Sequence, residues 1–227
     1  MSVSLRNVAL PRKGRKVIWI LTILLVTIGL LAAARRTYVL LGPPQVPRFA
    51  AAAAMDSGFV QHRALTLTHI LPAALFMLLM PLQFIRRIRE RHLAWHRWSG
   101  RLLVILGFVV GVSALVMSFT MAIGGANETA ATTLFALLFL VFLTLGFWNI
   151  REHRIARHRE WMIRAFGVVL GIATTRPIVG MFFIVQRLSP HEFFGIAFWL
   201  GFTLTLLGAE AWIHYARPQS TALPGKP

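Results

Sequence analysis

Long apolar runs constrain the fold of this 227-residue chain more than any other feature. Six such runs cover residues 17–34, 65–84, 102–123, 132–150, 163–185 and 193–213. About 20 consecutive apolar residues cross the hydrocarbon core of a bilayer as one helix. Lipid offers the backbone no hydrogen-bond partners, so each run must satisfy its own backbone groups. The pattern predicts an all-α polytopic membrane protein with about six transmembrane helices.

The polar remainder of the chain is short. We expect residues 1–16 to form a basic tail, residues 17–215 one transmembrane domain, and residues 216–227 a disordered tail. No polar stretch is long enough to bury a core of its own, so no soluble domain is expected. The segment between the first two runs, residues 35–64, predicts a short surface helix within its alanine-rich part.

The first apolar run has two interpretations. Its basic start and the small residues Ala32, Ala33 and Ala34 are also typical of a secretory signal peptide. The length of the run, and Arg35 and Arg36 directly after it, favour a retained membrane span instead. Cleavage remains the alternative.

Charge indicates how the helices are oriented. The net charge is +17, from 24 Lys and Arg against 7 Asp and Glu. In a membrane protein such an excess is typical of loops that stay in the cytoplasm, so no nucleic-acid partner is expected. Eighteen of the Lys and Arg residues fall on one side of the predicted membrane and five in the opposite loops. Both termini are therefore predicted to be cytoplasmic, beside anionic lipids.

Two basic turns resemble each other: IRRIRERHLAWHRWSGRLLVILG and NIREHRIARHREWMIRAFGVVLG. With one insertion, they align His96 with His158, Trp98 with Trp161, and Arg101 with Arg164. Both hairpins run the same way through the membrane, as a duplicated hairpin would; chance similarity of arginine-rich turns is the alternative. Duplication predicts a four-helix core made of two similar hairpins, with His96 facing His158.

These motifs carry a family resemblance. His69-Ile70, the PLQF run at 81–84, HRWSGR, HREWMIR and TTRP together resemble a bacterial family of predicted membrane proteins, domain of unknown function 2306, over residues 60–215. Leu103 departs from the family pattern, which has an aromatic residue there. The resemblance implies a multi-pass protein of a bacterial cytoplasmic membrane, and it supplies no reaction.

The histidine pair carries the most specific chemical hypothesis. Neutral imidazole is a common haem ligand, so His96 and His158 on facing helices could clamp one haem b. Arg101, Arg164 or Arg176 would pair with its propionates. Gly100, one turn after His96, would leave room for a flat ring. The alternative is that both histidines are interfacial residues that bind water or lipid phosphate.

Four further polar residues lie in or beside apolar runs: His69, Gln83, Arg176 and Glu210. Arg176 lies 12 residues after Arg164, about 18 Å along a helix and near the middle of the membrane. There it would contact an anion or form a structural ion pair. Glu210 is expected to pair with Arg164, Arg101, His96 or His158, because its depth matches theirs. His69 is expected to hydrogen-bond to a neighbouring helix.

Three function classes follow. The best specific hypothesis is a small b-type haem-binding electron-transfer protein that serves a redox partner or quinol. The alternatives are a small-molecule or ion transporter, from Arg176, Pro177 and Glu210, and a lipid-interacting or assembly protein, from the basic turns. The chain has no cysteine, which excludes thiolate metal sites, and it carries no recognisable catalytic signature, so an enzyme is not favoured.

Overall fold

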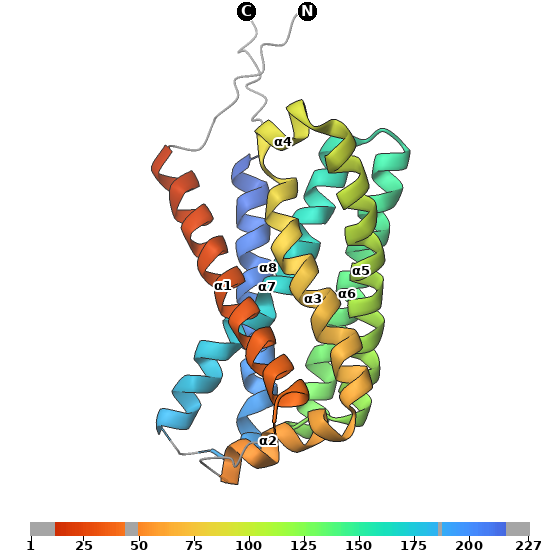
Figure 1. Cartoon of the computed structure of the whole chain (residues 1–227). Helices are drawn as coiled ribbons and strands as arrows, with labels where there is room; N and C mark the ends of the chain where they lie inside the picture. The colour runs from red at the N-terminus through yellow and green to blue at the C-terminus, as the bar shows by residue number, and fades with distance from the viewer. Residues whose placement is uncertain (1–11, 44–49, 186–187, 217–227) are drawn as a thin grey trace, which may run out of the picture.

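The described part of the chain is built from α-helices joined by short turns (Figure 1). The computed structural model describes residues 12–43, 50–185 and 188–216. Within these ranges the helices are α1 (Arg12–Leu41), α2 (Ala50–Gln61), α3 (Arg63–Gln83), α4 (Arg86–Arg91), α5 (Leu93–Thr120), α6 (Gly125–Arg151), α7 (Ile155–Val185) and α8 (Pro190–Ala216). Six of them are long and apolar enough to cross a membrane, which confirms the predicted class and the number of spans.

The helices extend beyond the apolar runs that predict them. The starts predicted at residues 102 and 163 are wrong, because α5 begins at Leu93 and α7 at Ile155. Apolar runs mark only the part of a helix that lies in hydrocarbon, whereas Arg and Glu are good helix formers that continue it into the interface. Both basic motifs are therefore helical. The predicted surface helix is confirmed as α2.

The tails are described only in part. Residues 12–16, predicted as tail, form the first turns of α1, while residues 1–11 lie outside the described range. The disordered tail predicted at 216–227 also lies outside it, except for Ala216 at the end of α8. Retention of the first span stays a prediction.

Four helices form the predicted core, and two flank it. α5 packs against α3 and α6, and α7 packs against α6, with a smaller contact to α3. α5 and α7 therefore stand diagonally across the four-helix core. α8 packs against α6 and α7, and α1 covers α3 and α7 (Figure 1).

Large apolar side chains fill the space between these helices. Phe76, Met80, Leu103 and Leu143 are almost fully buried, and Phe76 meets Phe139 edge to face, with ring centroids 5.7 Å apart. Glycines permit the closest helix approaches. A Cβ on Gly171 of α7 would lie 2.9 Å from the Cα of Phe202 on α8, so these two backbones are in direct contact.

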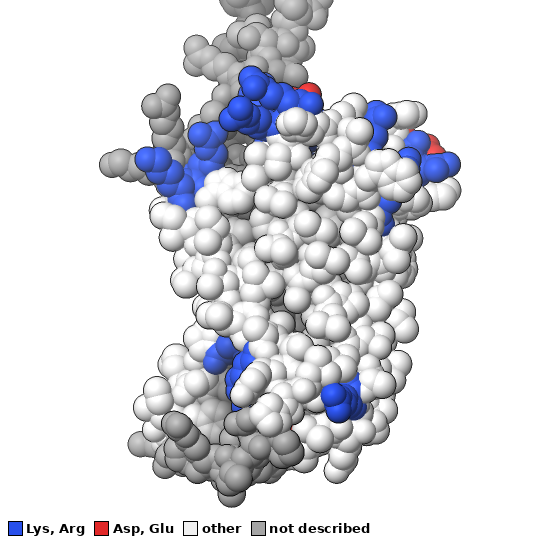
Figure 2. Space-filling view, viewed as in Figure 1, with Lys and Arg blue, Asp and Glu red and all other residues white. Residues whose placement is uncertain are grey.

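Charge divides the molecule into two ends. Lys and Arg gather at the end that holds the start of α1, α4, the α6–α7 turn and the end of α8, and few lie elsewhere on the face shown in Figure 2. We refer to this as the basic end. The opposite end holds α2, the end of α7 and the start of α8. The helices that carry His96 and His158 both begin at the basic end.

Candidate functional site at the basic end

His96 and His158 both lie near the basic end of the four-helix core. His96 lies in the first turn of α5 and His158 in the first turn of α7. Both are partly buried, and they are close enough to interact electrostatically. Because α5 and α7 are diagonal, the two histidines lie on opposite sides of this end of the core. The structure thus brings together the two residues that the repeat aligns.

The ring nitrogens of the two histidines have different surroundings. His158 Nδ1 lies 2.8 Å from the carbonyl oxygen of Gly146 on α6, an arrangement in which Nδ1–H donates and Nε2 keeps its lone pair. Histidines that bind metals are commonly oriented by such a bond. His96 Nδ1 is buried and has no hydrogen-bond partner among the described residues. A buried nitrogen of this kind is costly unless something binds it.

Gln83 at the end of α3 belongs to the same region. Its Nε2 donates to Ser99 Oγ at 2.8 Å, and Ser99 Oγ donates to the carbonyl of Trp95 at 2.6 Å. Gly100 borders open space, because a Cβ there would meet only Gln83 Oε1, at 3.7 Å. Sequence reasoning did not identify Ser99. The feature that could have pointed to it is a hydroxyl side chain about one helical turn after His96.

Glu210 pairs with Arg164, as expected from depth. Arg164 Nε donates to Glu210 Oε1 at 2.5 Å, and a terminal nitrogen donates to Oε2 at 2.9 Å, so the pair is bidentate. Arg164 also lies over the Trp161 ring, 4.6 Å from its centroid, and that ring stacks on Phe142. Arg164 is therefore committed to joining α7 to α8, rather than to a propionate.

Glu210→Gln is expected to lower the free energy of unfolding by about 1–3 kcal/mol, between the values for exposed and buried pairs. The arginine side chain is only 14% exposed, so it would lose its counter-ion where water is scarce, while the carboxylate side chain is 45% exposed. Thermal unfolding in detergent measures the loss, and Glu152→Gln, an exposed carboxylate in the α6–α7 turn, is the control. Equal melting temperatures for the two variants would contradict the prediction.

Arg101 repeats the local arrangement of Arg164. It lies over Trp98, 5.1 Å from the ring centroid, and in both helices the tryptophan precedes the arginine by three residues. The aligned residues thus have the same local geometry, as a duplicated hairpin would. Arg101 is exposed and has no ion-pair partner within the described ranges. It is the candidate propionate partner that remains available near the histidines.

Arg176 and His69 lie away from this site. The charged groups that interact with Arg176 are Arg35, Arg36 and Glu128, which belong to the opposite end rather than to the histidine pair. The fold places α1 beside this part of α7. The spacing of residues along α7 cannot predict that neighbour. His69 Nδ1 is 2.9 Å from Ser113 Oγ on α5, which confirms the expected interhelical hydrogen bond.

A buried asparagine was missed by sequence reasoning. Asn149 near the end of α6 donates from Nδ2 to the carbonyl of Leu145 at 2.8 Å, while its Oδ1 is buried without a partner in the described part of the chain. The available signal was an amide placed at the end of a long apolar run. After His96 Nδ1, Asn149 Oδ1 is the second buried polar atom without a partner in the described structure, and it lies near the Gly146 carbonyl at the end of α6.

Two imidazole side chains are the donor type that a bis-histidine haem takes as axial ligands. One histidine is oriented, the other has an unpartnered buried nitrogen, and Gly100 leaves room beside them. Leu103 lies two turns after His96 and Met162 one turn after His158, and both are buried in the apolar core. In the described residues no group of three His, Asp or Glu could hold a metal ion by itself.

Comparison with known proteins identifies the family. Residues 66–213 match the family described as "Predicted membrane protein (DUF2306)", and the chain belongs to it. The match contains the histidine pair, Gln83, Arg164 and Glu210, and leaves out α1 and α2. No curated protein and no solved structure matches the chain.

Proposed function

We propose that this member of the DUF2306 family is a small b-type haem-binding electron-transfer protein, with His96 and His158 as the axial ligands. One observation carries the proposal. Two histidines from diagonal helices lie at one end of the core, near enough to interact electrostatically; His158 Nδ1 is bonded to the Gly146 carbonyl, and His96 Nδ1 is buried without a partner among the described residues.

The surrounding residues have defined roles in this proposal. The Gly146 carbonyl holds the His158 ring in one orientation and makes Nε2 a stronger electron-pair donor to a metal ion. Trp161, stacked on Phe142, shields the pair on the side of α6 and α7. Arg101 offers a guanidinium to an anionic edge group, and the Arg164–Glu210 pair keeps α7 in place against α8. Bound haem would supply one-electron chemistry.

The proposal is tested by an absorption spectrum of the full chain, purified in detergent from cells supplied with haem, before and after dithionite. We expect a Soret band that shifts on reduction and a sharp alpha band. A spectrum without visible absorption, from protein that elutes as a single species on gel filtration, would overturn the proposed function.

We further propose that the basic end faces the cytoplasm of a bacterial inner membrane and that a redox partner or quinol exchanges electrons there. The gathering of Lys and Arg at one end supports this orientation (Figure 2). The same charges favour contact with anionic lipids.

The orientation can be measured with single cysteines, because the chain has none of its own. Gln61→Cys at the opposite end is expected to react with a membrane-impermeant maleimide in intact spheroplasts, since Gln61 is exposed at the end of α2. Glu152→Cys at the basic end should react only after lysis. The reverse labelling pattern would show that the orientation is inverted.

A further inference from the structure

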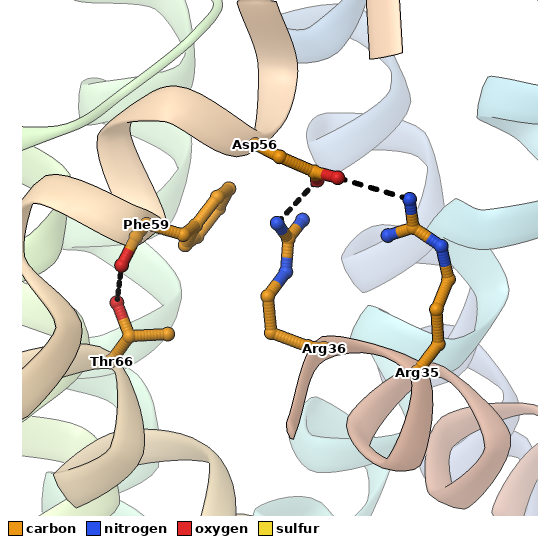
Figure 3. A network of polar contacts seen from close by, with 5 residues as sticks. All are labelled: Arg35, Arg36, Asp56, Phe59 and Thr66. Carbon is orange, nitrogen blue, oxygen red and sulfur yellow. Dashed lines mark hydrogen bonds and ion pairs between the residues drawn. The ribbon is translucent and has the colours of Figure 1, made fainter. Parts of the chain in front are cut away.

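A second charged cluster lies at the opposite end, outside the proposed haem site. Two consecutive arginines of α1 share one carboxylate from α2 (Figure 3). Arg35 is 3.1 Å from Asp56 Oδ2, and Arg36 contacts Asp56 Oδ1. The Arg36 guanidinium also lies over the Phe59 ring, 3.9 Å from its centroid. One carboxylate therefore serves two guanidinium groups.

The packing of α1 on α7 brings Arg176 to the same cluster. Both helices run from the basic end to the opposite end, and a Cβ on Gly29 of α1 would lie 3.7 Å from the Cβ of Ala173 on α7. From that contact, Arg36 lies two turns further along α1, about 10 Å, and Arg176 lies one turn further along α7, about 5 Å. Arg176 accordingly interacts electrostatically with both Arg35 and Arg36.

Within the described part of the chain, the carboxylates do not balance the charge of this cluster. The carboxylates that act on the three arginines are Asp56 and Glu128. Glu128 is nearly buried and already accepts the Gly124 N–H at 2.6 Å. Arg176 makes no hydrogen bond or close ion pair within the described ranges, although it lies in a membrane-spanning helix. A guanidinium at this depth normally has a partner, because leaving it unpaired costs several kcal/mol.

The position of Arg176 makes it reachable by a ligand. By its accessible surface, Arg176 is an exposed residue of α7. Pro177 follows it within α7, and the last turns of this helix lean outward from the bundle (Figure 1). Arg35 is also open, with 57% of its side chain exposed. Guanidinium groups bind phosphate through paired N–H donors, and several of them around one phosphate give both affinity and specificity.

We propose that Arg35, Arg36 and Arg176 form a binding site for an anionic phosphate group at the opposite end of the protein. The phosphate is carried either by an anionic phospholipid headgroup or by a free phosphate ion from the aqueous side. The site is separate from the histidine pair, and it neutralises the charge that Asp56 and Glu128 leave uncompensated.

The test compares the wild-type full chain with Arg176→Gln and with a matched control, Arg63→Gln. Arg63 begins α3 at the same end, is exposed, and lies outside the arginine cluster. Retention of phosphatidylglycerol and of zwitterionic phosphatidylcholine is measured by native mass spectrometry, and inorganic phosphate is titrated by calorimetry. Loss of one charge-assisted contact is expected to weaken binding about tenfold in Arg176→Gln, and to leave Arg63→Gln unchanged.

Asp56→Asn provides a variant with the opposite expected effect. Removing the carboxylate that competes for Arg35 and Arg36 should tighten anion binding, so a gain rather than a loss is measured. Dependence of phosphatidylglycerol binding on Arg176 would assign the site to a lipid, and dependence of inorganic phosphate binding would assign it to the free ion. If neither probe distinguishes Arg176→Gln from Arg63→Gln, or if Asp56→Asn fails to tighten binding, the proposal is overturned.

Discussion

His96→Ala is expected to abolish the Soret band of the purified protein, with loss of nearly all bound haem. The two proposed axial ligands come from different helices, so removing either one would open the proposed bis-histidine site. His96 is the cleaner of the two to replace, because its Nδ1 has no hydrogen-bond partner in the described structure and its loss breaks no internal bond. His158→Ala should have the same effect on the spectrum, together with loss of the bond to Gly146.

His92→Ala is the matched control for this experiment. His92 lies four residues before His96, between α4 and α5, and its side chain is exposed. The His92 variant should keep the wild-type spectrum. If the wild-type protein contains haem and the His96 variant folds with the same Soret absorbance, His96 is not a haem ligand. Gel filtration of each variant separates loss of haem from loss of fold.

Gly171→Ala is expected to lower the free energy of unfolding by about 1–3 kcal/mol, the usual range for overpacking a close contact. The added Cβ would lie 2.3 Å from Phe202 Cδ1 and 2.9 Å from Phe202 Cα. The ring could rotate away, but the Cα belongs to the α8 backbone, so α7 and α8 would have to separate. The same contact surface includes Gly201, where a Cβ would lie 3.0 Å from the backbone oxygen of Gly171.

Gly180→Ala on the same helix is expected to raise the free energy of unfolding rather than lower it. No neighbouring atom lies within 4 Å of a Cβ at Gly180, so nothing has to move. Replacing a helical glycine by alanine without a clash stabilises by about 0.5–1 kcal/mol. Thermal unfolding followed by tryptophan fluorescence in detergent measures both variants. Similar melting temperatures for the two would show that the α7–α8 contact at Gly171 is looser than described.

Much of the fold follows from hydropathy, because the bilayer imposes a length and an apolar composition on each span. The number of spans, the all-helical class and the four-helix core were predicted correctly for this reason. The depth of a polar residue in the membrane also indicated which residue it could pair with. Glu210 was expected at the level of Arg164, and the two form a bidentate pair.

The sequence could not show where the helices really begin or which faces they share. Charged and aromatic residues continue α5 and α7 beyond the apolar runs, so the two histidines are helical rather than part of a turn. The hydrogen bond that orients His158 goes to the backbone carbonyl of Gly146. Every residue has a backbone carbonyl, so the amino-acid sequence does not reveal this partner.

The sequence by itself determined the class of protein, the depth of each polar residue along its helix, and the correspondence between His96 and His158. Tertiary structure alone decided which of these residues become neighbours. Arg176 was one of three candidate partners for a haem at the histidines, but the contact between Gly29 and Ala173 places α1 beside this part of α7, where Arg176 interacts electrostatically with Arg35 and Arg36. The physical reason is that periodicity and hydropathy report depth and helical face, whereas the partner of that face depends on how helices distant in sequence pack together.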